Sequence, residues 1–240
     1  MPPEQIIHFQ ADGIQLTGAL HLPDAIPRPP FVIGCHGLLA DRSSPKQIAL
    51  AEALNRIGIA YFRFDHRGCG DSQGPFDSHD LLAARCSDLY HAIQAMQSNN
   101  ALGPLAGLFG SSFGGTVVLA TAAMHNVPWI ATYAAPISSR SITRPSPDEI
   151  QTNDPSAAKQ PTPYEFDISD RLSKLSHILV MHGEKDDIVP LSHATAIYEN
   201  AREPKQLVIH PGGDHRMTDT DHQHNFIETC RAWFGHFFSH

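Results

Sequence analysis

The sequence predicts an α/β protein with a mostly parallel sheet. Short apolar runs alternate with segments of helical periodicity over most of the 240 residues. Many of these runs are continuously apolar, which is typical of strands that are buried on both faces. Because repeated strand-to-helix crossovers are right-handed, we expect helices on both faces of a doubly wound sheet, with functional groups at the carboxyl ends of the strands.

The first expected elements establish this rhythm. QIIHFQ and IQLTGALHLP are separated by ADG, which predicts an antiparallel hairpin at the N-terminus. FVIGC at 31–35 is a buried strand, and 45–57 has helical spacing that ends at Gly58. The remaining expected elements are strands at 59–64, 104–110, 129–135, 177–183 and 206–212, and helices at 81–96, 112–124, about 191–201 and 222–238.

Composition limits the classes of partner. Hydrophobic residues make up 41% of the chain and the formal net charge is −8, which argues against nucleic acid or an anionic membrane as the partner. There is no apolar run near the ~20 residues of a membrane span, and MPPEQIIHFQ does not resemble a signal peptide. Four scattered cysteines fit free thiols in a reducing cytoplasm. We therefore expect a cytoplasmic protein with a small-molecule substrate, and a homodimer stays open.

One segment interrupts the alternation of strands and helices. Residues 136–174 are polar and rich in proline, and connections of this length inside a domain are usually functional or disordered. We expect a single domain over 1–240 with 136–174 as a cap insertion over the working edge of the sheet. A surface insertion without a catalytic role is an equal alternative.

A glycine-rich turn follows the strand at 104–110. GSSFG fits G-x-S-x-G with Ser112 in the central position, between an expected strand and an expected helix. A sharp turn here exposes the central side chain, and the helix start directs N–H groups toward developing negative charge. Ser112 is therefore the candidate nucleophile, whereas Ser111 should face back toward the sheet or a loop. The alternative is a glycine-rich helix start with an N-capping serine.

A serine hydroxyl needs a base within hydrogen-bond reach. HPGGDHRM carries His215 in a loop after one strand, and HGEKDDIVP carries Asp186 and Asp187 after the preceding strand. Both loops leave carboxyl ends of parallel strands, the edge at which Ser112 is also expected. The sequence thus predicts a Ser-His-Asp arrangement in which either carboxylate can serve.

The loop after FVIGC provides the expected oxyanion hole. Its backbone can supply the Leu38 N–H, and the residue after the nucleophile supplies the Phe113 N–H. Two such donors would stabilise the charge that develops on a carbonyl oxygen.

Together, five stretches resemble the α/β-hydrolase superfamily: HGLL, DHRGCGDS, GSSFG, HGEKDDIVP and GGDH. The resemblance implies the α/β-hydrolase fold and the chain order serine, acid, histidine. It selects Asp186 over Asp187, which remains the alternative, and it implies that DHRGCGDS is a scaffold for the nucleophile turn. Its compact size and the stretch FRFDHRGCGDSQG resemble small microbial serine esterases, including the feruloyl and cinnamoyl esterase group, in which a cap helps to bind the phenolic ring.

These features predict a serine carboxylesterase that works through an acyl-enzyme without metal or organic cofactor. A thioesterase or acyltransferase with the same triad remains open, as does a non-catalytic binding protein on this fold. Sixteen histidines also raise the hypothesis of a metal protein. Tyr133, Tyr164 and Phe166 are candidates for the acyl pocket, although core packing or surface exposure explains them equally well.

Overall fold

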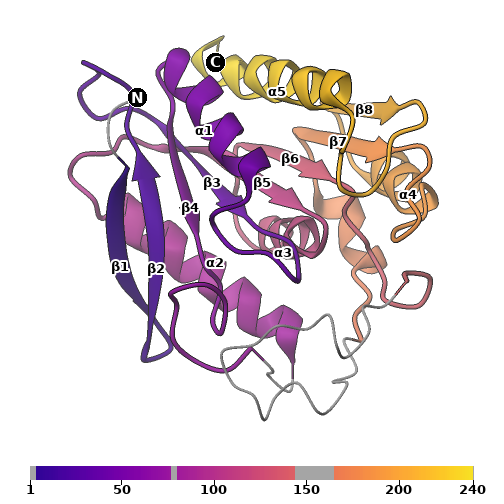
Figure 1. Cartoon of the computed structure of the whole chain (residues 1–240), viewed down its shortest axis with the longest axis horizontal. Coiled ribbons are helices and arrows are strands. Elements are labelled where there is room, and N and C mark those ends of the chain that lie inside the picture. The colour runs from indigo at the N-terminus through magenta and orange to yellow at the C-terminus, as the bar shows by residue number, and fades with distance from the viewer. Residues whose placement is uncertain (1–3, 77–79, 144–164, 240) are drawn as a thin grey trace.

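The computed structural model describes residues 4–76, 80–143 and 165–239. In these residues the chain forms an eight-stranded sheet with the order β1-β2-β4-β3-β5-β6-β7-β8 (Figure 1). The strands are β1 (Gln5–Ala11), β2 (Ile14–His21), β3 (Phe31–Cys35), β4 (Ala60–Phe64), β5 (Leu105–Ser111), β6 (Trp129–Tyr133), β7 (Ile178–Gly183) and β8 (Lys205–His210). The helices are α1 (Pro45–Arg56), α2 (Leu81–Gln97), α3 (Phe113–Ala122), α4 (Ser192–Asn200) and α5 (Thr220–Gly235), with 3₁₀ turns η3 (Ser169–Lys174) and η4 (His236–Ser239).

The N-terminal hairpin is the antiparallel part of the sheet. β1 pairs with β2 and β2 pairs with β4 in antiparallel register, whereas the pairs from β4 through β8 are parallel. Asp12 and Gly13 form the hairpin turn with φ of 50° and 78°, as a tight two-residue turn requires. The predicted α/β-hydrolase fold, with its hairpin and its mostly parallel sheet, is confirmed.

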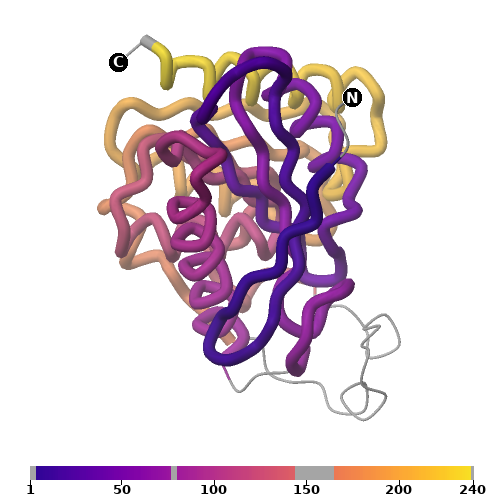
Figure 2. The backbone as a smooth tube through the Cα atoms, turned by 90° about the vertical axis from the view of Figure 1, so that its left-hand side faces the viewer, coloured from indigo at the N-terminus to yellow at the C-terminus, as the bar shows by residue number. Residues whose placement is uncertain are grey.

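Helices cover both faces of the sheet. One core lies between the sheet and helices α2, α3 and α4, and the other lies between the sheet and helices α1 and α5. Figure 2 views the molecule from the β1–β2 side, where α2 runs along the hairpin that it contacts. The parallel strands therefore end at one edge between two helical layers, and their carboxyl-terminal loops converge there.

Of the boundaries that differ from the expected ones, three have clear local reasons. α3 begins at Phe113, and Ser112 makes no side-chain cap bond, so the capping alternative for this serine is wrong. α5 begins at Thr220, because the Asp219 carboxylate accepts hydrogen bonds from the first backbone N–H groups. β8 ends at His210, and Gly212 then turns with a φ of 67°.

The expected cap at 136–174 is described only at its two ends, since 144–164 lie outside the described residues. An antiparallel bridge joins Ser138 to Asp167, and Ile168 and Leu172 are buried against the α2–α3 core. The two ends of the insertion thus lie side by side at the sheet edge. The division into one domain with a cap stays a prediction.

Candidate active site

A strained backbone turn places Ser112 between β5 and α3. Its φ of 54° and ψ of −129° lie in a region that only glycine adopts readily. A Cβ at Gly110 would lie 2.4 Å from the Gly114 carbonyl oxygen, and one at Gly114 would lie 2.4 Å from the His36 carbonyl oxygen. Because both positions exclude any larger residue, the turn is tight and its Ser112 side chain faces the cleft rather than the core.

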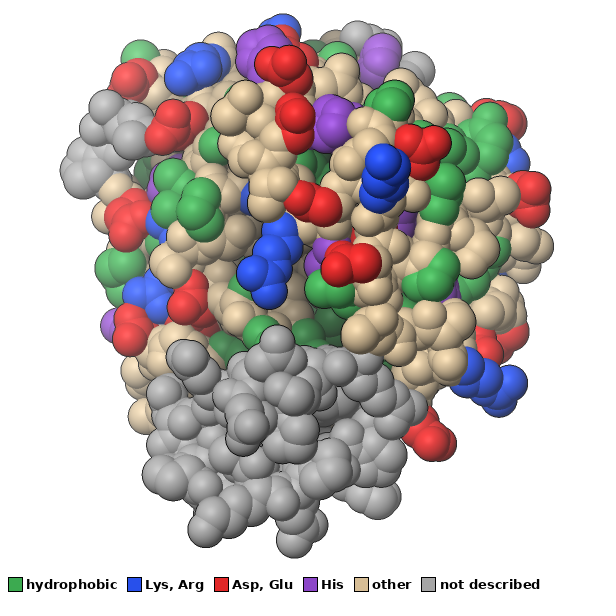
Figure 3. Space-filling view, turned by 45° about the vertical axis from the view of Figure 1, so that its right-hand side comes forward, with side chains coloured by type: hydrophobic (Ala, Val, Ile, Leu, Met, Phe, Trp, Pro, Cys, Tyr) green, Lys and Arg blue, Asp and Glu red, His purple; other side chains and the backbone are tan. Residues whose placement is uncertain are grey.

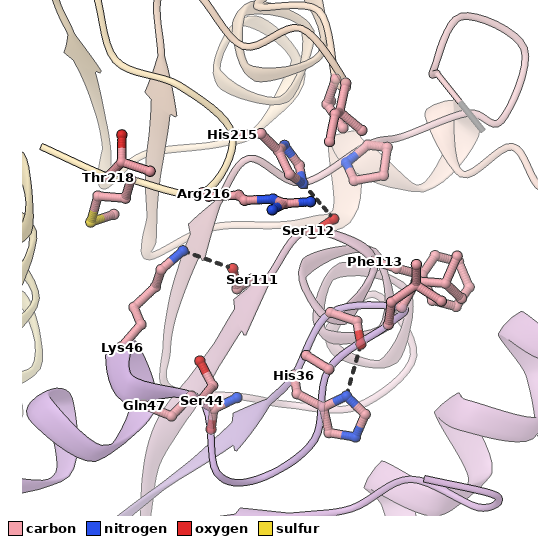
Figure 4. Close-up of a pocket in the computed structure, with 18 of the residues that line it drawn as sticks. His36, Ser44, Lys46, Gln47, Ser111, Ser112, Phe113, His215, Arg216 and Thr218 are labelled. Carbon is pink, nitrogen blue, oxygen red and sulfur yellow. Dashed lines mark hydrogen bonds between the residues drawn. The ribbon is translucent and has the colours of Figure 1, made fainter. Parts of the chain in front are cut away.

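The structure brings Ser112, His215 and Asp186 together. His215 Nε2 lies 3.0 Å from Ser112 Oγ (Figure 4). On the other side of the ring, His215 Nδ1 lies 2.7 Å from Asp186 Oδ2. With the Nδ1 proton donated to the carboxylate, Nε2 is free to accept the hydroxyl proton. The arrangement therefore contains a hydroxyl, a base and a carboxylate in hydrogen-bonded series.

Asp186 is kept as a buried, ionised carboxylate. Its Oδ1 accepts hydrogen bonds from the backbone N–H groups of Ile188 and Val189, at 2.9 and 2.7 Å. Burial would raise the pKa of Asp186, but hydrogen bonds from His182 and His215 outweigh it and hold that pKa well below the usual range. An ionised carboxylate can fix the His215 tautomer and stabilise its protonated form.

His182 was not singled out from the sequence. Its Nε2 lies 3.3 Å from Asp186 Oδ2 and 2.8 Å from the Val189 carbonyl oxygen, so that one N–H is shared between them. The only sequence signal is its position four residues before Asp186, at the end of β7.

Asp187 occupies a different environment from its neighbour. Its side chain is exposed at the rim of the cleft, and its backbone carbonyl accepts a hydrogen bond from Thr143. The geometry therefore pairs His215 with Asp186 rather than with Asp187.

The loop after β3 packs against Ser112 from the opposite side. A Cβ at Gly37 would lie 3.4 Å from Ser112 Cβ, which shows how closely the loop backbone approaches. His36 Nε2 accepts the His66 N–H at 3.1 Å, so its Nδ1–H donates to the Gly37 carbonyl at 2.8 Å. In a trans peptide the carbonyl and the following N–H point in opposite directions. The bond from His36 holds the Gly37 carbonyl toward the protein interior. The Leu38 N–H therefore points away from the interior.

Arg85 reinforces this orientation from α2. It is fully buried, and its guanidinium donates to the Leu38 carbonyl at 3.1 Å and to the Gly37 carbonyl at 3.4 Å. The same group lies 5.4 Å from the centre of the Phe113 ring. Arg85 thus contacts both residues expected to form the oxyanion hole, and sequence reasoning missed it because an arginine in an amphipathic helix is usually a surface charge.

Comparison with known proteins agrees with this architecture. Residues 28–139 match the family described as "Serine aminopeptidase, S33". The uncharacterised protein YfhR of Salmonella typhi is 31% identical over 227 residues, which cover 88% of this chain and 74% of that protein. The chain belongs to the α/β-hydrolase superfamily.

Solved structures give the same fold for this α/β-hydrolase. Est1E from Butyrivibrio proteoclasticus with bound ferulic acid has a TM-score of 0.82 at 21% identity and covers 98% of this chain and 100% of its own. A serine hydrolase without a lid from Xanthomonas campestris has a TM-score of 0.68 at 22% identity, with 99% and 94% coverage.

The DHRGCGDS loop of this α/β-hydrolase is expected to be a scaffold for the nucleophile turn. Its hydrogen bonds reach the loop after β3, which packs on Ser112, and also helix α2 and the hairpin. His66 binds His36 through its backbone N–H, and Arg67 donates to the buried Asp88 carboxylate at 2.8 Å. Asp65 accepts the Arg42 backbone N–H at 2.7 Å. The loop therefore supports the oxyanion side of the site.

A cleft of about 1070 Å³ opens over Ser112 and His215. Leu38 and Phe113 border it, as an oxyanion hole requires. We define two sides by their lining residues. The apolar side comprises Phe113, Ile142, Phe166, Ile188 and Val189, and the basic side comprises Ser44, Lys46, Gln47, Arg216 and Gln223.

The three aromatic candidates for the acyl pocket have different outcomes. Phe166 lines the apolar side and packs on Phe113 with ring centres 5.3 Å apart. For Tyr133 the core-packing alternative is confirmed, because it is fully buried and its hydroxyl donates to the Asp214 carbonyl at 2.7 Å. Tyr164 lies outside the described residues.

On the face of the molecule shown in Figure 3, acidic, basic and histidine side chains are interspersed with hydrophobic ones. Within the described ranges, no group of three or more histidine, cysteine, aspartate or glutamate side chains is placed to hold a metal ion. Over the same ranges, no helix is both long and apolar enough to cross a membrane.

Proposed function

We propose that the protein is a serine carboxylesterase that cleaves small or medium acyl esters. The observation that carries the proposal is the pair of contacts from His215, at 3.0 Å to Ser112 Oγ and 2.7 Å to Asp186 Oδ2. A binding protein on this fold would not need a strained serine held against a base. The cleft beside Ser112 has room for a small ester.

In the proposed mechanism, His215 accepts the Ser112 proton as Oγ attacks the ester carbonyl. Asp186 stabilises the imidazolium, and the N–H groups of Leu38 and Phe113 stabilise the oxyanion. Collapse of this intermediate breaks the ester bond, and the alcohol leaves with the proton from His215. Water then attacks the acyl-Ser112 carbonyl with His215 again as base, releasing the acid and restoring the hydroxyl.

The proposal includes a cytoplasmic location. All four cysteines are buried and free, which suits a reducing compartment. The substrate would be a small molecule.

The first experiment is hydrolysis of p-nitrophenyl butyrate by the purified protein. Ser112→Ala should lower kcat by up to ~10⁶-fold, because the nucleophile is removed. Ser87→Ala is the control, since Ser87 lies on α2 and hydrogen-bonds Asp12 outside the cleft. A fluorophosphonate probe should label Ser112 and no other residue. Undiminished hydrolysis by Ser112→Ala, or labelling elsewhere, would rule out the mechanism.

A matched pair of butyryl esters and butyryl thioesters separates the esterase from the thioesterase. The esterase proposal predicts a higher kcat/KM for the oxygen ester when the leaving groups have similar acidity. A clear preference for the thioester would replace the carboxylesterase assignment but retain the triad.

A further inference from the structure

The basic side of the cleft contains a lysine without an acidic partner. Lys46 Nζ lies 3.3 Å from Ser111 Oγ, beside the nucleophile, and 4.3 Å from the centre of the Tyr133 ring. In the described part of the chain, Lys46 takes part in none of the ion pairs, which belong to arginines and histidines. Its nearest contacts are thus a hydroxyl and an aromatic ring, and a cation that faces a hydrolase cleft without an ion-pair partner within 4 Å can accept an anion.

The backbone position of Lys46 makes this charge more costly. Lys46 lies in the first turn of α1, where the helix dipole disfavours a positive charge. That turn contains no acidic residue, and the N-cap Ser44 makes no side-chain cap bond. Burial lowers the pKa of Lys46 to about 8, although Asp214 and Asp186 act in the opposite direction. A bound anion would relieve both penalties.

Two further donors border the same side. Gln47 is buried, its Oε1 accepts from the Tyr61 hydroxyl, and its Nε2 has no hydrogen-bond partner among the described residues. Arg216 follows His215 and is exposed, and its side chain extends toward the Ser112 end of the cleft (Figure 4). Within the described ranges Arg216 is also outside the set of ion pairs.

We propose that Lys46 and Arg216 bind a carboxylate of the substrate, so that the preferred esters carry a carboxylate a few bonds from the scissile carbonyl. This inference rests on the proposed esterase function and narrows its substrate class. A carboxylate offers two oxygens that can accept from an ammonium and a guanidinium together. The apolar side then takes the uncharged part of the ester.

The test compares esters that differ in charge but have similar size. One pair places the charge on the acid part, namely mono-p-nitrophenyl glutarate against p-nitrophenyl pentanoate. The other pair places it on the alcohol part, namely 4-carboxyphenyl butyrate against 4-carbamoylphenyl butyrate. After subtraction of spontaneous hydrolysis, kcat/KM in at least one pair should favour the anionic ester.

Lys46→Met should lower the anionic-to-neutral ratio of kcat/KM by roughly 10-fold or more, because a charge-assisted hydrogen bond is lost. Lys46→Arg should retain most of the preference. Lys205→Met is the matched control, since Lys205 also lies over a tyrosine ring, 4.9 Å from the centre of Tyr198, but does not line the cleft. The ratio should not change in this control.

A pH profile gives a readout that a merely structural role would not alter. The ammonium is charged below its pKa, so the preference for the anionic ester should decline as pH rises through about 8. In Lys46→Arg the preference should persist, because arginine stays protonated. The titratable and charged groups around Lys46 are Tyr133 on β6, Asp186 after β7, His210 at the end of β8, Asp214, His215 and Arg216 after β8, and Cys230 on α5.

The carboxylate site would be overturned if neither pair showed an anionic preference, or if the anionic-to-neutral ratio of kcat/KM were unchanged in Lys46→Met. In that case, Ser112-dependent hydrolysis of neutral esters would still support the esterase proposal. Should no ester be hydrolysed, the esterase proposal fails, and calorimetry with glutarate decides the site separately. Binding that weakens at least 10-fold in Lys46→Met would support the site, and equal binding or none would refute it.

Discussion

The two sides of Ser112 are built in different ways. On the acid–base side, Asp186 and His215 stand on loops that follow the neighbouring strands β7 and β8, and they reach Ser112 through two short hydrogen bonds. On the oxyanion side, a single loop after β3 depends on side chains from other elements, above all Arg85 on α2 and His66 after β4.

The positions of the groups on these two sides are fixed by different parts of the fold. Parallel strands in register fix the spacing of the loops that follow them, so the acid–base side follows from the sheet itself. A backbone N–H has no side chain to anchor it, so its direction depends on what holds the neighbouring carbonyls. The first arrangement should lose most activity when Asp186 or His215 is changed, and the second should lose less when one supporting side chain is changed.

On the acid–base side, we expect the largest loss of activity from a change at Asp186. Asp186→Asn should lower kcat by about 10⁴-fold, because the amide no longer fixes the His215 tautomer or stabilises its charge. Asp187→Asn is the matched control and should change kcat little, since its side chain is exposed and the contact to His215 comes from Asp186. Steady-state kinetics on p-nitrophenyl butyrate measures both. A larger loss in Asp187→Asn would reverse the assignment.

The oxyanion side is tested at Arg85, a positioning residue. Arg85→Met keeps much of the side-chain volume but removes the guanidinium bonds to the Gly37 and Leu38 carbonyls, so that His36 holds the Gly37 carbonyl without Arg85. We expect kcat to fall by about 100-fold with KM nearly unchanged, as when one oxyanion donor is lost. Arg85→Lys should recover part of the activity.

Because Arg85 is fully buried, its variants also need a stability measurement. Thermal unfolding of Arg85→Met separates the two effects, since a folded protein at the assay temperature with low kcat supports the positioning role. A folded Arg85→Met with full kcat would show that the loop after β3 holds its direction without Arg85.

The same comparison explains how much the sequence could predict. The succession of strands along the chain, the N-terminal hairpin and the turn around Ser112 could be predicted because each depends on local residue types. Gly110 and Gly114 signalled the turn by the space that they leave for neighbouring carbonyls. The loops that carry the acid and His215 could be located because they follow strands that the apolar pattern identifies, whereas only the resemblance to the α/β hydrolases selected Asp186 over Asp187.

The oxyanion side could not be predicted in the same way. Arg85 is 47 residues beyond Leu38 and binds backbone carbonyls, which carry no sequence signal. The sequence left Tyr133 open between the pocket and the core, because the pattern of its strand does not show that the Asp214 carbonyl accepts its hydroxyl proton. No sequence signal singles out Lys46, and its place in the cleft follows only from its contacts with Ser111 and Tyr133.

The smallest expected effect is on the second histidine of the acid–base side. His182→Phe keeps a ring in a fully buried site but removes the N–H shared by Asp186 and the Val189 carbonyl. Asp186 retains the bonds from His215, Ile188 and Val189, so kcat/KM at pH 7 should fall only a few-fold. His91→Phe is the control, because His91 bonds Ser87 on α2 away from the cleft.

We expect His182→Phe to change the free energy of unfolding more clearly than it changes activity at neutral pH. His182 helps to hold the pKa of Asp186 below its unfolded value of ~3.9. A lowered carboxyl pKa contributes stability that is present above the unfolded pKa and is lost as pH falls through the folded one. His182→Phe should therefore lower the free energy of unfolding by about 1.5–3 kcal/mol at pH 7, and the difference from the native protein should shrink below pH 4. Urea denaturation at several pH values measures this, and a difference that grows on acidification would contradict it.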